Sequence, residues 1–491
     1  MENIAYFARK KITMDKFVSQ VKITTSSSIS KILNIQGDSV ISSCDLVNGF
    51  VSLSGKINIS VIYLNNENNI EHTNMMFDFI EKQQTNYNIE DVFAEDKVEV
   101  KNVNFSGTEI ICVFEHSLVL NGHYKYEFPI ISDEDNQIVT KKSKFEALKY
   151  VTSCEEDFVI AEETEVNLSN ITVITTTAKV ILYETNCLVD KVLVDGKIIA
   201  NIVYKDEQGI ASFNKEFEFK QEISAEGVVP NMILSTFSNV KNVNIVAEAN
   251  ELKTNLVCSF DVYIKGIIYE ENTYEYVDDI FSLKNKISST IDYIEAKSFS
   301  VMKNYSDTFM LSTDISNIEN FDDVIGVYLP KFEVENIEEF EDKSLLTGTI
   351  YSNALYRADN NLSSLNTSLP VRIEISRESS ELVGRLDSAV EITSYKVKAG
   401  KYLEIVYVLN YGVIFEKSIS ASFVKNYELK GEKPENTGGI KLYITSDGET
   451  LFQVAKSLNV KPEVISSQNE VGDIFEQGEK IYVYSPINLL N

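Results

Sequence analysis

A motif of glycine and tyrosine recurs three times along this chain and constrains its fold more than any other sequence feature. Residues 55–63, 196–204 and 348–356 each begin with glycine and end with tyrosine eight residues later. The three glycines are 141 and then 152 residues apart. Repetition at a nearly fixed spacing indicates copies of one structural unit, and about 150 residues is the size of a typical domain. The 491 residues therefore predict three similar domains and a shorter remainder.

Apolar and polar residues alternate inside each motif, which is the pattern of a β-strand with one buried face. A polar turn follows each tyrosine, and a second alternating segment follows the turn. This order predicts a β-hairpin in every copy. The residues expected to face the core are Ile57, Ile59, Val61, Tyr63, Ile198, Ala200, Ile202, Tyr204, Ile350, Ser352, Ala354 and Tyr356. We expect the three tyrosines to pack in the core rather than to contact a ligand.

Each copy continues with two further strand-like segments, rich in Val, Ile, Tyr, Phe and Thr, at residues 98–114, 240–260 and 390–408. The expected fold class is mainly β, with three tandem antiparallel domains that are each a sandwich or a partly open barrel. Their expected bounds are 1–150, 151–300 and 301–428, and the third copy diverges most. Short helical connectors are expected at residues 141–150 and 282–296.

The charge of the chain excludes several classes of partner. Lysines and arginines number 45 against 74 aspartates and glutamates, which gives a net charge of −29 at neutral pH. Nucleic acids and anionic membranes attract clustered positive charge, so we expect neither as a partner. No run of 18 apolar residues occurs, so no membrane-spanning segment is expected. The N-terminal residues lack the apolar run of a signal peptide, which favours a cytosolic protein.

Metal, cofactor and catalytic sites are not expected. The five cysteines are scattered singly, which indicates free thiols in a reducing compartment. His72, His116 and His123 are expected at the surface or in loops. The acidic run at residues 333–341 lacks the spacing of a calcium loop and is expected to be a solvated edge. No nucleophile elbow, phosphate-binding loop or zinc-protease motif occurs, so we expect no enzyme, although a pair of carboxylates stays open in so acidic a chain.

The composition changes after residue 428. Residues 429–439 contain three glycines and a proline without alternation, which predicts a linker. A strand is expected from residue 440, and Thr450 is expected to cap a helix that begins at Leu451. Pro462 is expected in the first turn of a second helix, and a closing strand is expected after Gly478. Residues 440–487 are therefore expected to form a small βααβ domain.

This domain resembles the lysin motif (LysM), whose glycine, acid, threonine and leucine run matches residues 448–451. Its asparagine and late glycine match Asn469 and Gly478. LysM domains bind N-acetylglucosamine polymers in a cleft between two loops, which correspond here to residues 447–451 and 475–480. The residues expected to contact a glycan or a protein partner are Asp447, Gly448, Glu449, Thr450, Leu451, Lys456, Ile465, Asn469, Gln477 and Gly478. Of these, Ile465 is expected in the core and Lys456 at the surface.

Three β domains followed by one LysM resemble the SipL family of spore morphogenesis proteins from clostridial endospore formers, whose repeats are called SPOCS domains. The resemblance implies a non-enzymatic structural or adaptor protein without cofactors, in the mother-cell cytoplasm at the forespore surface and in the spore coat. It also implies that the LysM docks a SpoIVA-like coat morphogenetic ATPase while coat and cortex are built. A peptidoglycan- or cortex-binding protein is the alternative.

Two further properties concern the partners. Because the LysM is acidic, we expect a basic partner surface and binding that weakens as salt rises. Whether the chain forms a homo-oligomer through exposed strand edges is left open.

Overall fold

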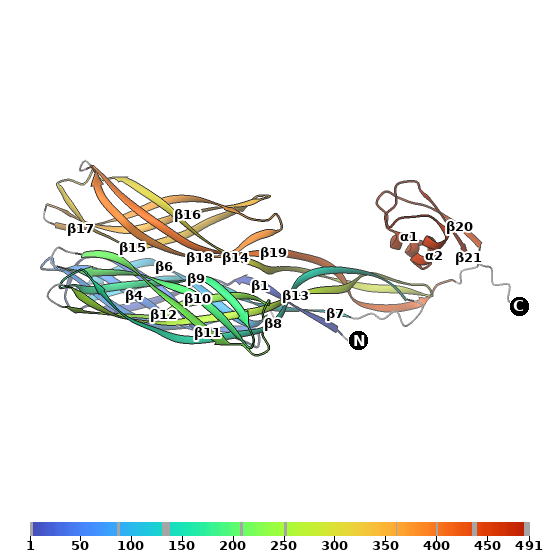
Figure 1. Cartoon of the computed structure of the whole chain (residues 1–491), viewed down its shortest axis with the longest axis horizontal. Helices are drawn as coiled ribbons and strands as arrows, with labels where there is room; N and C mark the ends of the chain where they lie inside the picture. Colours follow the sequence, from blue (N-terminus) through green and yellow to red (C-terminus); the bar gives the residue numbers. More distant parts are fainter. Residues whose placement is uncertain are drawn as a thin grey trace.

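The computed structural model (Figure 1) describes residues 3–85, 89–129, 138–206, 210–249, 253–359, 361–398, 401–434 and 439–485. Within them the protein is mainly β and its strands pair antiparallel, as the sequence predicts. No helix in these ranges is long and apolar enough to cross a membrane.

The strands group into three large modules and a small C-terminal module. Module 1 contains β1 (Asn3–Thr13), β2 (Phe17–Thr24), β3 (Ile29–Val47), β4 (Phe50–Asn65), β5 (Ile70–Gln84), β6 (Ile89–Ser106) and β7 (Glu109–Pro129). Module 2 contains β8 (Ile138–Val166), β9 (Thr172–Leu188), β10 (Lys191–Lys205), β11 (Ile210–Ser224), β12 (Ile233–Ala249) and β13 (Thr254–Ser282). Module 3 contains β14 (Asn285–Asp314), β15 (Phe321–Glu339), β16 (Lys343–Ala358), β17 (Asn361–Ser376), β18 (Glu381–Lys398) and β19 (Tyr402–Glu432). The C-terminal module contains β20 (Gly439–Ile444), α1 (Leu451–Leu458), α2 (Pro462–Gln468) and β21 (Lys480–Ser485).

Modules 1, 2 and 3 share one strand order. In each, three consecutive strands form a small sheet with the second strand in the middle, namely β3-β4-β5, β9-β10-β11 and β15-β16-β17. In the second sheet of each module the last strand is central, in the orders β6-β7-β2, β12-β13-β8 and β18-β19-β14. One cluster of buried apolar residues lies between the two sheets of each module. The recurring sequence motif thus coincides with a recurring topology.

The glycine-tyrosine motif occupies the middle strand of each first sheet, and its expected core-facing residues are buried except Tyr356, which is half-buried. Steric space explains why each motif begins with glycine. A Cβ atom on Gly55 would lie 2.6 Å from the ring of Phe79, and one on Gly196 would lie 2.8 Å from the ring of Phe219. Both aromatic residues pair directly with the glycines across the sheet. A side chain at this position would therefore displace a core ring.

The helical connectors expected at residues 141–150 and 282–296 are wrong, because these residues lie almost entirely in β8 and β14. Both strands also run through the positions expected as domain boundaries, 150 and 300. The exposed side chains of Lys142, Lys144 and Glu146 alternate with the partly or fully buried Phe145 and Ala147. That two-residue period fits a strand, and the pairing of this segment with β13 holds it extended.

The ends of the longest strands form a stalk that projects beyond the modules (Figure 1). We define the stalk as three paired ribbons, residues 3–13 with 119–129, 138–150 with 269–282, and 285–299 with 416–432. All three ribbons contribute to one buried cluster, which includes Tyr6, Phe128, Tyr274 and Phe423. Aromatic side chains bury a large apolar area each, so a stalk without further layers can still enclose a core.

The three modules also meet at the opposite end from the stalk. Ile62, Val203 and Leu355 occupy the same position after the motif glycine, and all three are fully buried in one cluster. Neighbouring modules are joined in a closed cycle. Asn74 of β5 donates a hydrogen bond to the carbonyl of Ile174 in β9 at 2.9 Å. The corresponding contacts are Ser212 of β11 to Val327 of β15, and Lys31 of β3 to Ser363 of β17.

Two of the three histidines contradict the expected surface location. The side chain of His116 is fully buried. Its Nδ1 atom is hydrogen-bonded to Asp96 at 2.6 Å, and its Nε2 atom is hydrogen-bonded to the Ser19 hydroxyl at 3.0 Å. His123 is also buried, and its Nε2 atom lies 2.8 Å from the hydroxyl of Tyr269 in module 2. A polar side chain can be buried when hydrogen bonds replace its water. His72 is half-buried, and burial lowers its pKa.

The five cysteines are free thiols, as expected. Burial raises the pKa of Cys44 to about 12 and that of Cys112, Cys154 and Cys258 to about 11. Because thiolates are the reactive species, we expect the native protein to react with iodoacetamide at pH 8 at least about tenfold more slowly than the urea-unfolded chain. Mass spectrometry of each cysteine over time measures this. Fast labelling of Cys112, Cys154 or Cys258 in the native protein would contradict their buried placement.

Candidate functional site

The C-terminal module is a compact unit built on a two-stranded sheet. β20 and β21 pair antiparallel from Gly439 with Ser485 to Ile444 with Lys480. Val454, Ala455, Ile465 and Val483 are fully buried between the sheet and the two helices. Since both helices are short, tertiary packing and capping rather than propensity stabilise them.

Local sequence signals set both helices. Thr450 caps α1, as predicted, and it forms a reciprocal capping box with Gln453. Pro462 occupies the first turn of α2, where its missing N–H costs nothing. Gly448 and Gly478 have φ angles of +71° and +88°, which glycine adopts without the strain that a Cβ atom would cause.

The two loops of the expected cleft lie side by side. The N–H of Gly448 donates to the carbonyl of Phe475 at 3.0 Å, and the N–H of Phe475 donates to the carbonyl of Glu449 at 2.9 Å. Asp447, Gly448, Gln477 and Gly478 are exposed on these loops. Of the ten residues expected to bind a partner, these four are brought together and are accessible.

The other six residues take part in the structure of the module. Ile465 is fully buried and Leu451 and Thr450 are partly buried at the start of α1. Glu449 accepts hydrogen bonds from the Tyr443 hydroxyl at 2.6 Å and from the Ser446 N–H, and the first of these raises the pKa of Tyr443.

The side chains of Asn469 and Lys456 each contact a neighbouring strand. The Asn469 side chain donates to the carbonyl of Tyr482 and accepts from its N–H, so it fixes β21 to the end of α2. Lys456, expected at the surface, is exposed but forms an ion pair with Asp279 of β13 at 2.6 Å.

The module rests on the end of the stalk through this face of α1. Phe281 of β13 is buried in the core of the module, with its ring 5.2 Å from that of Phe452 in an edge-to-face arrangement. The Asn459 side chain donates to the carbonyl of Leu283 at 2.8 Å, and Lys433 donates to Asn459 at 2.6 Å. Burial lowers the pKa of Lys433. This face of the module is therefore already occupied by the chain itself.

The outer face of the two-stranded sheet is apolar and uncovered, which the sequence pattern did not predict. We call it the apolar sheet face. Its side chains are exposed to the extent of 75% at Ile440, 53% at Leu442, 61% at Ile444, 50% at Tyr482 and 58% at Tyr484. Ile440 pairs with Tyr484 and Leu442 with Tyr482, so the five residues form one continuous surface. Large contiguous apolar patches on soluble proteins mark interaction sites.

Acidic residues border the apolar sheet face at one end. Thr445, which follows Ile444, is hydrogen-bonded to the carbonyls of Glu476 and Glu479. The side chains of Asp447, Glu476 and Glu479 are exposed there. Among the described residues no three His, Cys, Asp or Glu side chains are grouped as a metal ion would require. A surface that is apolar in the middle and acidic at its border favours a partner with the complementary arrangement.

Comparison with known protein families identifies part of module 2. Residues 170–248 match the family described as "SipL, SPOCS domain". This segment covers β9 to β12, including the second glycine-tyrosine motif. A search of curated proteins and a search of solved structures found no significant match. The matched segment supports a SipL-like, sporulation-related protein.

Proposed function

We propose that the protein is a non-enzymatic adaptor of spore-envelope assembly, which docks a coat protein through its C-terminal module and helps to place coat and cortex layers. The family match in module 2 supports the link to sporulation. The strand order β20, α1, α2, β21 supports a LysM-like module. The strand order that modules 1, 2 and 3 share supports tandem SPOCS units, each a sandwich of two sheets. In the family that the chain resembles, the partner is a SpoIVA-like ATPase.

The apolar sheet face is the observation that carries this proposal. Five large apolar side chains, each at least half exposed, are unfavourable in water and gain free energy when a partner covers them. Tyrosine is enriched among the residues that dominate the binding energy of protein interfaces, and this face carries Tyr482 and Tyr484. The setting follows from the same proposal, namely the mother-cell cytoplasm at the forespore surface and, later, the spore coat.

A second function has its own observation. The exposed loop residues Asp447, Gly448, Gln477 and Gly478 lie where LysM domains bind N-acetylglucosamine polymers. Peptidoglycan or cortex binding through these loops is the competing proposal, and it does not use the apolar sheet face.

Substitutions on the apolar sheet face separate the two proposals. In the full chain we expect the double variant Leu442→Ser/Tyr482→Ser to weaken binding to the purified coat ATPase by about 30-fold or more, because central apolar contacts dominate interface energies. Isothermal titration measures the affinity, and sedimentation with purified peptidoglycan measures glycan binding. Both residues are exposed, so circular dichroism is expected to be unchanged.

Two matched controls complete the test. Val159→Ser removes a similarly exposed apolar side chain from β8 and is expected to leave binding unchanged. Gln477→Ala removes an exposed side chain from the loops, and the same two assays measure its binding to the ATPase and to peptidoglycan. If the sheet-face variant binds the ATPase normally while Gln477→Ala no longer binds peptidoglycan, docking through the sheet face is wrong. That result would favour the glycan-binding proposal instead. The acidic border also predicts lower affinity at higher salt.

A further inference from the structure

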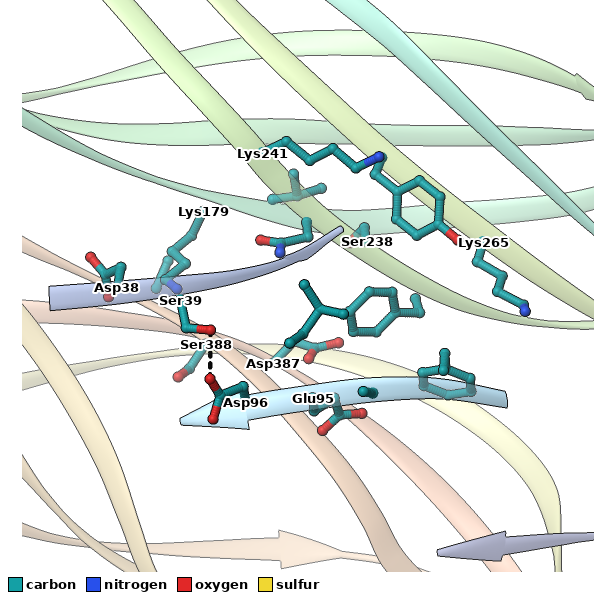
Figure 2. Close-up of a pocket in the computed structure, with 18 of the residues that line it drawn as sticks. Asp38, Ser39, Glu95, Asp96, Lys179, Ser238, Lys241, Lys265, Asp387 and Ser388 are labelled. Carbon is teal, nitrogen blue, oxygen red and sulfur yellow. Dashed lines mark hydrogen bonds between the residues drawn. The ribbon is translucent and has the colours of Figure 1, made fainter. Parts of the chain in front are cut away.

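A polar cavity of about 670 Å³ lies where modules 1, 2 and 3 meet, and its wall includes strands from all three (Figure 2). Such a volume is within the range of small-molecule sites. Its wall carries the aromatic side chains of Phe93, Phe237, Tyr263 and Phe332. A second cavity of about 540 Å³ shares part of this wall, including Asp38, Asp96 and Lys241.

The charges of the cavity are unevenly placed. The wall contains the acidic residues Asp38, Asp45, Glu95, Asp96, Glu155, Asp157 and Asp387 and the basic residues Lys179, Lys241, Lys265 and Lys331. In Figure 2, Glu95, Asp96 and Asp387 lie on one side, while Lys241 and Lys265 lie on the other. Lys241 is paired with Asp157 at 2.5 Å, and Lys331 is paired with Glu333 at 3.0 Å.

Two deeply buried side chains present oxygen atoms without a hydrogen-bond partner among the described residues. The Asp96 side chain is fully buried, and its Oδ2 atom accepts from Ser39 at 2.6 Å and contacts His116 Nδ1 at 2.6 Å. Its Oδ1 atom is unpartnered. Asn201 is 4% exposed, and its Nδ2 atom donates to Asn214 at 2.7 Å, while its Oδ1 atom is unpartnered. Buried polar atoms left unpaired cost free energy, so such atoms call for a ligand or water.

The neighbouring cavity shows the same chemistry. Asn58 Oδ1, Ser60 Oγ and Thr176 Oγ1 are buried there without a partner among the described residues. Every one of these atoms is an oxygen that can accept a hydrogen bond. The hydroxyls can also donate, but the carboxylate and amide oxygens only accept, so a ligand that satisfies those oxygens has to supply donors.

Asp96 is specific to module 1. It precedes Val98 by two residues, and the matching positions before Val240 and Val390 are Ser238 and Ser388. All three residues line the cavity. The strand order is the same in the three modules, so the fold itself does not require a carboxylate here. The buried carboxylate is therefore particular to module 1, where one of its oxygens pairs with His116 and the other is unpartnered among the described residues.

We propose that this cavity binds a linear organic polyamine. Ammonium groups are donors only and carry the charge that the acidic wall favours, and aromatic faces attract cations as well. A bare metal ion fits less well, because the described residues offer no group of three acidic, His or Cys ligands. This proposal is independent of docking through the C-terminal module.

Equilibrium dialysis of the full chain with spermidine and cadaverine tests the proposal at about 0.15 M salt, where weak surface attraction is screened. We expect saturable binding of one polyamine per chain. Asp96→Asn and Asn201→Leu are each expected to lower the affinity by about tenfold or more, because the first removes a negative charge and the second removes an acceptor for a charged donor. Asp96 is also hydrogen-bonded to His116, so its replacement affects the fold as well as the cavity. Asn201→Leu is therefore included as a second, independent variant.

The controls distinguish the cavity from general attraction to an acidic protein. Glu319→Gln removes one exposed carboxylate and is expected to bind like the wild type. Pentanediol, the neutral analogue of cadaverine, is expected not to bind. The proposal fails if binding does not saturate, if the diol binds equally well, or if all three variants lose affinity to the same extent.

Discussion

Replacing Glu416 by alanine is expected to lower the free energy of unfolding by about 3–5 kcal/mol. Glu416 of β19 pairs with Arg9 of β1 at 2.9 Å, and both side chains are only 8% exposed. The pair lies where module 1 and module 3 join, since β1 and β14 pair through Arg9 and Lys297. Removal of the carboxylate leaves the Arg9 guanidinium buried without its counter-charge, and water cannot replace it fully.

Urea denaturation of the full chain, followed by circular dichroism, measures this loss. Glu109→Ala is the matched control, because its partner Lys22 and Glu109 are both more than half exposed and such pairs contribute less than about 1 kcal/mol. The double variant Arg9→Met/Glu416→Leu is expected to recover most of the stability, because no unpaired charge stays buried. If the single variant behaves like Glu109→Ala, the pair does not join the modules.

A glycine supports the same contact. A Cβ atom on Gly384 of β18 would overlap the side chain of Glu416. Gly384→Ala is therefore expected to displace the carboxylate from Arg9 and to destabilise the chain in the same direction as Glu416→Ala.

The repeat and its strands were predictable from sequence because they depend on local patterns. The alternation around Ile57, Ile198 and Ile350 identifies a strand and its buried face without knowledge of the rest of the chain. The stalk was not predictable in this way. Tyr274 pairs with Phe145, which is more than 120 residues away, and short windows contain no information on such pairings.

Buried polar contacts were missed for a related reason. His116 is an isolated histidine in the sequence, and only the fold brings Asp96 and Ser19 to its two ring nitrogens. Conversely, Thr450, Pro462, Gly448 and Gly478 were placed correctly because caps and turns depend on neighbouring residues.

The apolar sheet face shows where pattern alone misleads. In β20, alternation groups Ile440, Leu442 and Ile444 on one face, and the usual interpretation places such a face in the core. The structure turns the opposite face inward, so that Tyr443 reaches Glu449 and Lys441 reaches the carbonyl of Leu458. The outward apolar face of this short strand is therefore consistent with the proposed external partner.

Phe281→Ala is expected to release the C-terminal module from the stalk without unfolding it. Loss of a buried phenylalanine typically costs about 3–5 kcal/mol, and Phe281 belongs to the stalk while most of its neighbours belong to the module. The module keeps its own core, including Val454 and Ile465. Cleavage by endoproteinase Glu-C after Glu432 is expected to accelerate by about tenfold or more, because the next residue, Lys433, is held by Asn459 of the module only in the docked arrangement.

The matched control is Phe340→Ala, which removes an exposed phenylalanine far from this contact and is expected to leave the cleavage rate unchanged. Lys456→Gln removes only the ion pair with Asp279 and is expected to have a small effect, because such a partly exposed pair is weak. Unchanged cleavage of Phe281→Ala would show that the module is held by other contacts. Since the apolar sheet face does not touch the stalk residues that dock α1, the released module is expected to bind its partner with unchanged affinity. That result would mean that docking sets the position of the partner relative to the three large modules, and that partner affinity resides in the C-terminal module.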